Sequence, residues 1–410
     1  MRYVIIGAGP TGLGAAWKLN QEGADWSLYE AEPWAGGLSA SFLTEGFTWD
    51  LGGHILFSHY PEFDKTLNAL MPSAQWHYHE RRAFIRFRNA WVPYPFQHNL
   101  HHLPKQEQAE CLQGLAAAAE RQNSAPTHSF LDLILRSMGD GLARHFMVPY
   151  NTKVWAYPPS RLGTDWTGER IAIPDLARIR RNIAEHKDDV GWGPNNLFRF
   201  PAHGGTGAIW RTLANSLPRD RVHFSCAVTG IDTGRKQVHF ANGRQVPFDV
   251  LVSTMPLNRL ASLARLDSLT HSAAGLLHTS THVIGVGLPG PVPGSAADKC
   301  WLYFPEEQYP FYRVTVFSNY SRFNGYRRME YGYPVPTVER DEILKEVLPA
   351  LEVLGIYSRG RFGAWKYEVG NMDHSFMQGA EVVGRLLACQ PERTLTSPGE
   401  VNRLRMACAR

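Results

Sequence analysis

The sequence has few cysteines, and their arrangement argues against the protein classes that depend on cysteine. Five cysteines among 410 residues are odd in number, lie far apart and form no Cys-x-x-Cys pair. This pattern favours free thiols in a reducing compartment over a secreted disulfide framework or a cysteine-ligated metal site. The positions concerned are Cys111, Cys226, Cys300, Cys389 and Cys408.

Long apolar runs and clusters of like charge are also missing. No apolar run is long enough to span a bilayer, and the chain opens directly on an apolar strand pattern, which leaves no room for a signal peptide. The net charge of +4 suits an anionic ligand, but it comes without a Lys/Arg run or a nucleic-acid-binding motif. We therefore expect a cytoplasmic protein that binds neither nucleic acid nor membrane.

What is present is the composition of a globular protein, with 44% hydrophobic and 20% charged residues. The length predicts two or three structural units. The sequence shows no nucleophile–base set and no cluster of metal ligands, so we predict no metal site.

The first thirty-odd residues combine the parts of a dinucleotide-binding βαβ unit. An apolar strand pattern precedes the Gly-x-Gly-x-x-Gly motif of Gly7, Gly9 and Gly12, a helical pattern follows, and a second strand ends at Glu30. The glycines permit a tight turn and a close approach of pyrophosphate, the helix N-terminus offers N–H groups to phosphate, and the acid can accept from ribose. A purely structural turn is the alternative, and the full context favours a dinucleotide.

Further glycine pairs favour FAD over NAD. Gly36 and Gly37 follow the acidic strand end, and Gly52 and Gly53 come soon after. Such pairs suit loops that pass close to a cofactor. Glycine chemistry alone predicts a nucleotide with FAD preferred, and the order of these motifs resembles the flavoprotein group that includes the amine oxidases and UDP-galactopyranose mutases.

Two histidines follow the second of these pairs. A structural role is the default for a single histidine in such a run, because histidine is often half-buried. The glycine pair directly before His54 indicates close backbone approach to a flat, large group. His54 is therefore the better candidate for cofactor contact, and His59 is the weaker one.

A proline-stiffened segment displays Tyr94, Phe96 and Gln97. Aromatic rings and a carboxamide on a rigid loop suit the stacking and edge recognition of a base. A packed surface loop explains the same residues equally well. The following block, 104–182, is mostly helical in pattern, and we expect it to cover the cofactor domain.

The second half of the chain returns to sheet patterns. Residues 222–224, 227–231 and 237–240 predict a small antiparallel sheet. The run 249–256 predicts a buried strand whose end faces a ligand crevice. Residues beyond Gln390 have the pattern of a polar tail.

The predicted fold class is α/β, with a Rossmann-like FAD-binding domain, a helical insertion and a second domain built on an antiparallel sheet. We expect the FAD-binding domain to be discontinuous, the helical domain to cap the substrate, and the antiparallel domain to bind it as well. The predicted ranges are 1–75, 191–268 and 355–400 for the FAD-binding domain, 95–185 for the helical domain, and 76–94 and 269–354 for the antiparallel domain.

Over residues 1–390 the sequence resembles the UDP-galactopyranose mutases of the eukaryotic type. The resemblance implies an intramolecular transferase that interconverts UDP-galactopyranose and UDP-galactofuranose with non-covalent, reduced FAD. It implies that flavin N5 attacks the anomeric carbon and displaces UDP, that the adduct opens to an iminium, and that the sugar recloses on another hydroxyl before UDP returns. The segments that carry it are 7–19, 50–59, 91–97, 149–155, 193–210, 300–320 and 358–376.

The resemblance also implies roles for individual residues. The implied cofactor-binding residues are Gly7, Gly9, Gly12, Glu30, Gly37, Leu38, Gly53, His54, Val228, Gly370, Asn371, Met372 and Ser375. The implied uridine residues are Tyr94, Phe96, Gln97, Asn151 and Trp155. The implied diphosphate residues are Tyr303, Arg313, Tyr333, Arg361 and Tyr367, with Tyr320 as a further substrate-binding position. The implied catalytic residues are His54, which lies against the flavin, Arg170 and Asn195 near the sugar, and Arg313 and Arg361.

One departure from the family concerns the segment between Tyr320 and Tyr333, which is several tens of residues shorter here. The change motivates a second hypothesis, the same chemistry on another nucleotide sugar. An amine-oxidase-like oxidoreductase and a non-catalytic FAD- or nucleotide-binding homologue are the remaining alternatives. The resemblance allows NADPH as the reductant, a UDP-sugar as the substrate and a homo-oligomeric assembly.

Overall fold

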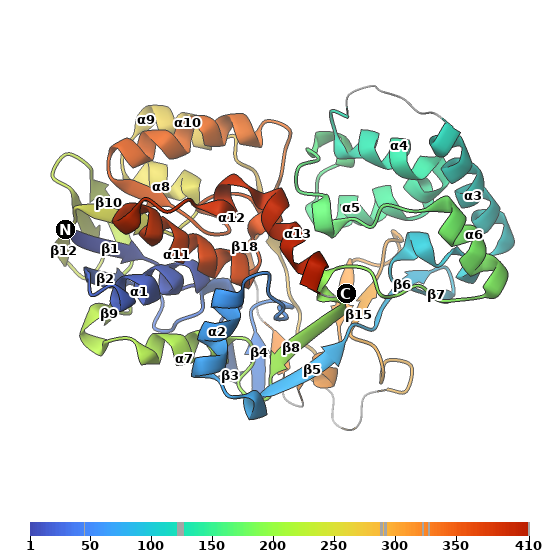
Figure 1. Ribbon diagram of the computed structural model, residues 1–410, viewed down its shortest axis with the longest axis horizontal. Coiled ribbons are helices and arrows are strands. Elements are labelled where there is room, and N and C mark those ends of the chain that lie inside the picture. The colour runs from blue at the N-terminus through green and yellow to red at the C-terminus, as the bar shows by residue number, and fades with distance from the viewer. Residues whose placement is uncertain are drawn as a thin grey trace. The chain divides into compact units, whose positions relative to one another are not determined.

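The computed structural model describes residues 1–44, 46–120, 127–287, 290, 293–321, 324–326 and 329–408 of the chain. It divides into two compact units, labelled by their elements in Figure 1. The first unit comprises Met1–His77, Arg199–Gly287 and Phe323–Arg410, and the second comprises Tyr78–Phe198 and Leu288–Arg322. The predicted three-domain boundaries stay a prediction.

A five-stranded parallel sheet lies at the centre of the first unit, in the order β19-β13-β1-β2-β9. Its strands are β1 (Arg2–Ile6), β2 (Asp25–Tyr29), β9 (Val222–His223), β13 (Val250–Ser253) and β19 (Ile356–Ser358). The sheet confirms the Rossmann-like prediction. The assignment of residues 222–224 to an antiparallel sheet was wrong, because β9 pairs in parallel with the end of β2.

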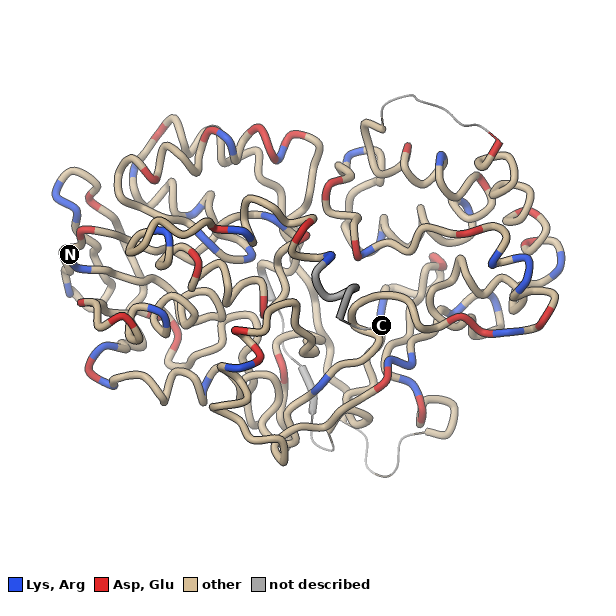
Figure 2. Tube along the Cα trace, viewed as in Figure 1, with Lys and Arg blue, Asp and Glu red and all other residues tan. Residues whose placement is uncertain are grey.

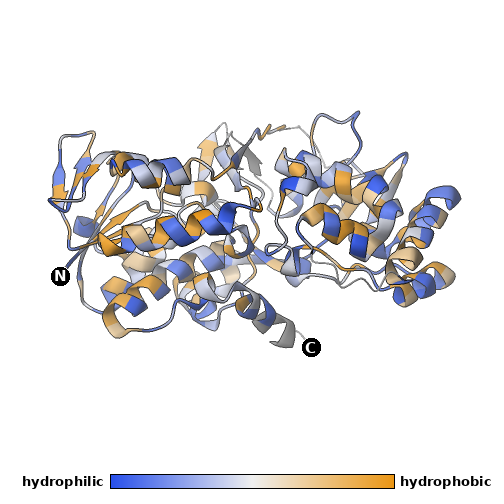
Figure 3. Ribbon diagram, turned by 90° about the horizontal axis from the view of Figure 1, so that it is seen from above, coloured by the Kyte–Doolittle hydropathy of each residue, from blue (hydrophilic) through white to orange (hydrophobic). Residues whose placement is uncertain are grey.

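Two helices with glycines at their contact pack together in the first unit. These are α1 (Pro10–Gln21) and α11 (Met372–Ala388). A side chain at Gly14 would overlap the Phe376 carbonyl, and one at Gly379 would overlap the Thr11 carbonyl. Small residues therefore let the two backbones approach closely. Figure 3 shows helices striped in orange and blue, as expected of amphipathic helices with one face in the core.

The remaining elements of the first unit surround this core. Its other helices are α2 (Pro61–Leu70), α7 (Gly207–Ser216), α8 (Leu257–Leu263), α9 (Asp267–Ala273), α10 (Arg340–Val353), α12 (Arg393–Thr396) and α13 (Pro398–Cys408). Its smaller sheets contain β10 (Val228–Asp232), β11 (Gln237–Phe240) and β12 (Gln245–Pro247); β3 (Ser41–Thr44), β4 (Phe47–Asp50) and β17 (Asn324–Tyr326); and β14 (His278–Thr281) and β18 (Met329–Pro334). Helices α12 and α13 stand where a polar tail was expected, so that expectation was wrong.

The second unit combines a four-stranded sheet with helices. The sheet has the order β16-β15-β6-β7. Its strands are β6 (Ala83–Phe87), β7 (Ala90–Pro93), β15 (Trp301–Tyr303) and β16 (Arg313–Thr315). Its helices are α3 (Lys105–Glu120), α4 (Phe130–Leu142), a π-helical turn (Ala143–Met147), α5 (Val148–Trp155) and α6 (Leu176–Glu185). Two of the four boundaries between the units along the chain fall within strands, one in β5 (Trp76–Glu80) and one in β8 (Leu197–Pro201).

Charged residues of both signs alternate along the trace of each unit (Figure 2). Among the described residues, no helix has both the length and the apolar character needed to cross a bilayer. In the shortened segment after Tyr320, residues 322, 323, 327 and 328 lie outside the described residues.

Candidate active site

The glycine motif forms a tight turn between β1 and α1. Gly7 adopts a φ of 103° and donates its N–H to the Tyr29 carbonyl at 2.8 Å. A side chain at Gly12 would overlap the Gly7 carbonyl oxygen. Helix α1 begins after Gly9 without a side-chain cap and without an acid in its first turn. Its first N–H groups are therefore available to an anion such as pyrophosphate.

Glu30 lies at the end of β2, beside this turn. Its carboxylate accepts the Ala8 N–H at 2.5 Å and the Glu32 N–H at 2.9 Å. Only 8% of the residue is exposed, and burial raises the pKa of the carboxyl group. A carboxylate has about four acceptor positions, so Glu30 keeps acceptor capacity for a ribose hydroxyl.

The second glycine pair lies directly opposite the first turn. Gly36 and Gly37 both have positive φ, at 118° and 52°, and the Gly36 N–H donates to the Ala8 carbonyl at 2.8 Å. A Cβ atom at Gly37 would stand 3.2 Å from the Gly9 Cα atom. The two turns form a cradle that side chains would fill, and this cradle fits the diphosphate of FAD. Half-buried Leu38 packs against the adjacent apolar core.

The start of α11 and the loop after β4 supply the other predicted flavin residues of the first unit. Asn371 caps α11 and accepts the Ser375 N–H at 2.9 Å through its backbone carbonyl, while Gly370 and Met372 are buried next to it. Gly53 and His54 are half-buried, and the His54 N–H bonds the Gly52 carbonyl at 2.8 Å. Val228 begins β10 and is half-buried.

His59 has a structural contact that its sequence position did not reveal. Its N–H and its Nδ1 lie 3.0 and 2.7 Å from the Asp373 carboxylate, and its ring stacks on His374 with centroids 4.6 Å apart. The two histidines hold the pKa of Asp373 well below its usual range despite complete burial. The pair therefore ties the loop that carries His54 to the first turn of α11.

Asp50 is the first residue of the segment 50–59, yet sequence reasoning gave it no role of its own. It accepts the Ser41 hydroxyl and the Thr206 N–H, the latter at 3.2 Å, and the Gly207 N–H bonds Ser41 Oγ at 2.6 Å. Burial raises the Asp50 pKa to about 7. The carboxyl group thereby joins β3 and β4 to the glycine turn before α7.

Arg361 gathers the predicted diphosphate residues of the first unit. Its guanidinium carbon lies 5.2 Å from the Tyr333 ring centroid and 5.5 Å from that of Tyr367. Its Nη1 donates to the Gly370 carbonyl at 3.0 Å and its Nη2 to the Gly332 carbonyl at 3.3 Å. The predicted diphosphate residues of the first unit therefore adjoin its predicted flavin segment.

The predicted base-binding residues gather in the second unit around a chain of aromatic rings. Fully buried Phe96 stacks on Phe146 at 4.7 Å, and Phe146 stacks on Tyr150 at 5.2 Å. Tyr303 packs 5.4 Å from Tyr150 and 5.7 Å from Tyr94, measured between ring centroids. The aromatic chain therefore links the proline-stiffened segment, α5 and β15.

Three buried polar or aromatic side chains complete this group. Gln97 donates its Nε2 to the Ala172 carbonyl at 2.6 Å, whereas its buried Oε1 has no hydrogen-bond partner among the described residues. Asn151 donates to the Met147 carbonyl at 2.7 Å. Trp155 is 1% exposed and packs edge-on to Trp166. The Gln97 amide is thus fixed through its Nε2.

Tyr303 and Arg313 are direct partners across the β15–β16 ladder and are both half-buried. Tyr320 is instead buried in the core, where its ring packs against Phe317 and Trp301. Arg170 is half-buried at the end of a short 3-10 turn, next to Glu169.

Asn195 is held by a residue that sequence reasoning missed. Arg81 donates to Asn195 Oδ1 and to the Trp192 carbonyl, both at 2.5 Å, and its guanidinium lies 4.7 Å from the Tyr94 ring centroid. Arg81 is only 6% exposed. Its sequence neighbours gave no signal, because both hydrogen-bond acceptors lie more than a hundred positions away in the chain.

Two groups among the described residues bring possible metal ligands close together. These are His59, Asp373 and His374, and His101, His102 and Asp188. In both groups, direct hydrogen bonds between imidazole and carboxylate explain why the side chains lie close together. The distances are 2.7 Å for His59 with Asp373, and 2.9 and 2.7 Å for His101 and His102 with Asp188.

Comparisons with known proteins place the chain among flavoproteins. The sequence profile of the flavin-containing amine oxidoreductases matches residues 10–292. A solved structure of reduced UDP-galactopyranose mutase is 42% identical over 98% of both chains, with a TM-score of 0.94. A protoporphyrinogen oxidase candidate from Exiguobacterium sp. 255-15 has a TM-score of 0.68 at 16% identity, over 94% of this chain and 98% of that one, and shows the fold alone.

A curated relative matches over part of its length. Protoporphyrinogen oxidase 2 of Arabidopsis thaliana is 22% identical over 298 residues, which are 62% of this chain and 57% of that protein. The glycine cradle, Glu30 and the uncapped start of α1 fit the flavin cofactor that the family profile names. The chain thus belongs to the flavin-containing amine oxidoreductase family and, within it, to the UDP-galactopyranose mutases, which are isomerases.

Proposed function

We propose that this protein interconverts UDP-galactopyranose and UDP-galactofuranose with FAD as its cofactor. The observation that carries the proposal is the position of Arg361. One guanidinium lies beside two tyrosine rings and bonds the carbonyl of Gly370, two residues before the first residue of α11. A guanidinium among phenols suits a diphosphate, and this one adjoins the segment predicted to hold the flavin.

A bound, reduced flavin would supply a nucleophilic N5 atom for reaction at the anomeric carbon of the sugar. The protein's own residues supply binding and charge. Arg361 in the first unit would hold phosphate oxygens and stabilise the charge that UDP carries as a leaving group, and Arg313 in the second unit is proposed as a diphosphate residue on the family resemblance alone. Charge-assisted hydrogen bonds of this kind contribute about 1.5–3 kcal/mol each.

Base recognition is assigned in this proposal to the second unit. Gln97 Oε1 is a buried acceptor whose amide is fixed by the Ala172 carbonyl. The N3–H of uracil is a donor of the kind that such an acceptor requires. We place Arg170 and Asn195 at the sugar and His54 at the flavin. NADPH is the proposed biological reductant.

An anaerobic isomerisation assay tests the function. The purified flavoprotein is reduced with dithionite, mixed with UDP-galactofuranose and analysed for UDP-galactopyranose by chromatography, with the oxidised protein as the control. We expect conversion only with reduced flavin. Absence of conversion by a reduced protein that binds UDP would contradict the proposed sugar and favour another nucleotide sugar.

A net oxidoreductase is the second candidate, because the family profile that matches the chain describes amine oxidoreductases. That activity would consume an amine or a similar donor, reduce the flavin and require no UDP. Reduction of the oxidised protein by amines, together with indifference to UDP, would favour it over the mutase.

A further inference from the structure

Lys153 makes an unusual set of contacts for a lysine on a helix. It lies on α5 between Asn151 and Trp155, and its Nζ donates to the backbone carbonyls of Phe304, Glu306 and Tyr309 at 3.1, 2.5 and 2.7 Å. An ammonium group has three N–H donors, and all three are engaged. The ammonium group is therefore fixed by three carbonyls, although the side chain is only half-buried.

The carbonyls that Lys153 binds belong to the turn of the β15–β16 hairpin. The last rung of this ladder pairs Tyr303 with Arg313, and the Phe304 N–H then bonds the Tyr312 carbonyl at 2.9 Å. Arg313 and Tyr303 are the proposed diphosphate residues of this unit. The turn next to them is held by Lys153 at three points, so their position depends on this clamp.

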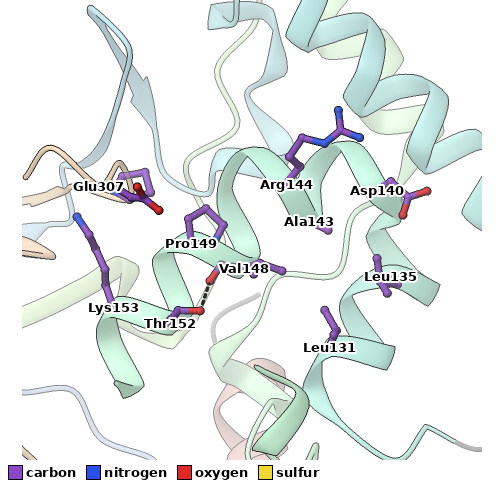
Figure 4. Close-up of a pocket in the computed structure, with 11 residues that line it drawn as sticks. Leu131, Leu135, Asp140, Ala143, Arg144, Val148, Pro149, Thr152, Lys153 and Glu307 are labelled. Atoms are coloured by element: carbon purple, nitrogen blue, oxygen red, sulfur yellow. Dashed lines mark hydrogen bonds between the residues drawn. The ribbon is translucent and has the colours of Figure 1, made fainter. Parts of the chain in front are cut away.

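The clamp starts from the helix that carries the proposed uridine residues. Figure 4 shows Lys153 extending from α5 toward the loop of Glu307, beside Thr152 and Pro149. These side chains line one end of a surface hollow of about 670 Å³ that α4 lines with Leu131 and Leu135. Asn151 and Trp155, in contrast, are buried. Helix α5 thus carries the proposed uridine residues Asn151 and Trp155, and Lys153 links the same helix to the β15–β16 hairpin.

We propose that Lys153 is a positioning residue that fixes the diphosphate hairpin relative to the uridine helix. The inference rests on the proposed UDP-sugar function and extends it. The base and the diphosphate of a nucleoside diphosphate are separated by a fixed covalent distance. A rigid link between the two binding elements therefore selects a ligand of that length and lowers the entropy lost on binding.

The test compares substitutions at Lys153 with the same change elsewhere in the unit. Lys153→Met keeps the length of the side chain and removes every donor, and Lys153→Arg keeps charge and donors. Lys105→Met, at an exposed position in the first turn of α3, is the matched control. UDP affinity is measured by titration of the flavin-loaded proteins, and amide hydrogen exchange is measured for residues 304–312.

We expect Lys153→Met to weaken UDP binding by about tenfold or more and to speed exchange in 304–312, with flavin content and absorbance unchanged. In the isomerisation assay, KM should rise more than kcat falls. Lys153→Arg should recover most of the affinity, and Lys105→Met should behave as the wild type. Lys153→Gln provides a milder variant with the same expected direction if Lys153→Met does not fold.

Unchanged UDP affinity in Lys153→Met, with or without faster exchange, would overturn the inference. A failure of the proposed function has a different signature, namely a wild-type protein that binds UDP but does not isomerise the sugar. In that case the UDP titration still decides the role of Lys153.

Discussion

The two units hold their proposed ligands in different ways. In the first, the flavin cradle consists mainly of backbone: two glycine turns, uncapped N–H groups at the start of α1, and one acid, Glu30, bonded to main-chain N–H groups. In the second, the proposed nucleotide residues are side chains drawn from separate segments and linked by ring contacts and by the clamps of Arg81 and Lys153. A side chain added at a glycine of the backbone cradle should therefore abolish flavin binding. Removal of one side chain from the second unit should instead lower the affinity for the nucleotide by the contribution of that side chain.

The largest expected effect follows from a substitution in the backbone cradle. Gly12→Val places atoms where the Gly7 carbonyl stands, so the turn cannot keep its form. We expect the purified variant to lack flavin and to lose about 1–3 kcal/mol of stability from overpacking. The measurements are the flavin-to-protein absorbance ratio and the urea midpoint.

Gly230→Val is the matched control for this change, since no atom lies within 4 Å of a Cβ built at that glycine. It should retain flavin. Full flavin content in Gly12→Val would contradict the account of the cradle.

The next largest effect is on UDP binding, and it compares two residues that face each other across the β15–β16 ladder of the second unit. Arg313→Ala removes charge-assisted donors and should weaken UDP binding by roughly 10- to 100-fold, while the flavin stays bound in the other unit. Tyr303→Phe, on the same rung, removes one neutral hydroxyl and should cost about 0.5–1.5 kcal/mol. UDP titration decides between them, and a tyrosine variant that binds as weakly as the arginine variant would refute the assignment.

A smaller effect concerns the choice of base. The Ala172 carbonyl fixes the Gln97 amide and leaves its Oε1 without a hydrogen-bond partner among the described residues, so we propose Oε1 as the acceptor for the base. Uracil offers a donor at N3 and cytosine an acceptor, so the wild type should prefer UDP to CDP by about tenfold or more. Gln97→Leu should abolish this preference. Equal binding of the two nucleotides by the wild type would show that Gln97 does not read the base.

The last expected effect concerns stability and not ligand binding, and it is a pH dependence in the first unit. Burial raises the Asp50 pKa to about 7, above the value of about 4 expected in the unfolded chain. The folded state therefore binds the extra proton between these values, and the free energy of unfolding should fall as the pH rises from about 4 to about 7. The change is on the order of a few kcal/mol at most.

Asp50→Asn should flatten this slope, because the amide keeps an acceptor for Ser41 and Thr206 without a charge. Urea unfolding across that pH range measures it, and Asp25→Asn at an exposed strand end is the control. An identical slope in Asp50→Asn and the wild type would exclude Asp50 as the source.

The same contrast explains what the sequence could predict. The strand predicted before the glycine motif and the strand predicted to end at Glu30 correspond to β1 and β2, because glycine spacing and apolar periodicity are local signals. Arg81 and Lys153 have no such signal. Their partners are carbonyls and a carboxamide brought close only by the folded chain, 109 to 156 positions away.

The short strand β9 shows that a local pattern can predict a strand without predicting its partner in the sheet. Residues 222–223 have a strand pattern, but pattern alone does not say which edge they join. They pair with Leu28 and Tyr29 in the parallel sheet. Likewise, the roles of Asn151 and Arg313 were expected from family resemblance and not from any spacing that the sequence displays.

The most direct test of the central claim is the number of turnovers per flavin reduction. The flavin is reduced once with one equivalent of dithionite, oxygen is excluded, excess UDP-galactofuranose is added, and product and flavin absorbance are recorded together. An isomerase returns its electrons in every cycle, so we predict many molecules of UDP-galactopyranose per flavin with the flavin still reduced. At most one product per flavin, with the flavin oxidised as it forms, would contradict the isomerase account.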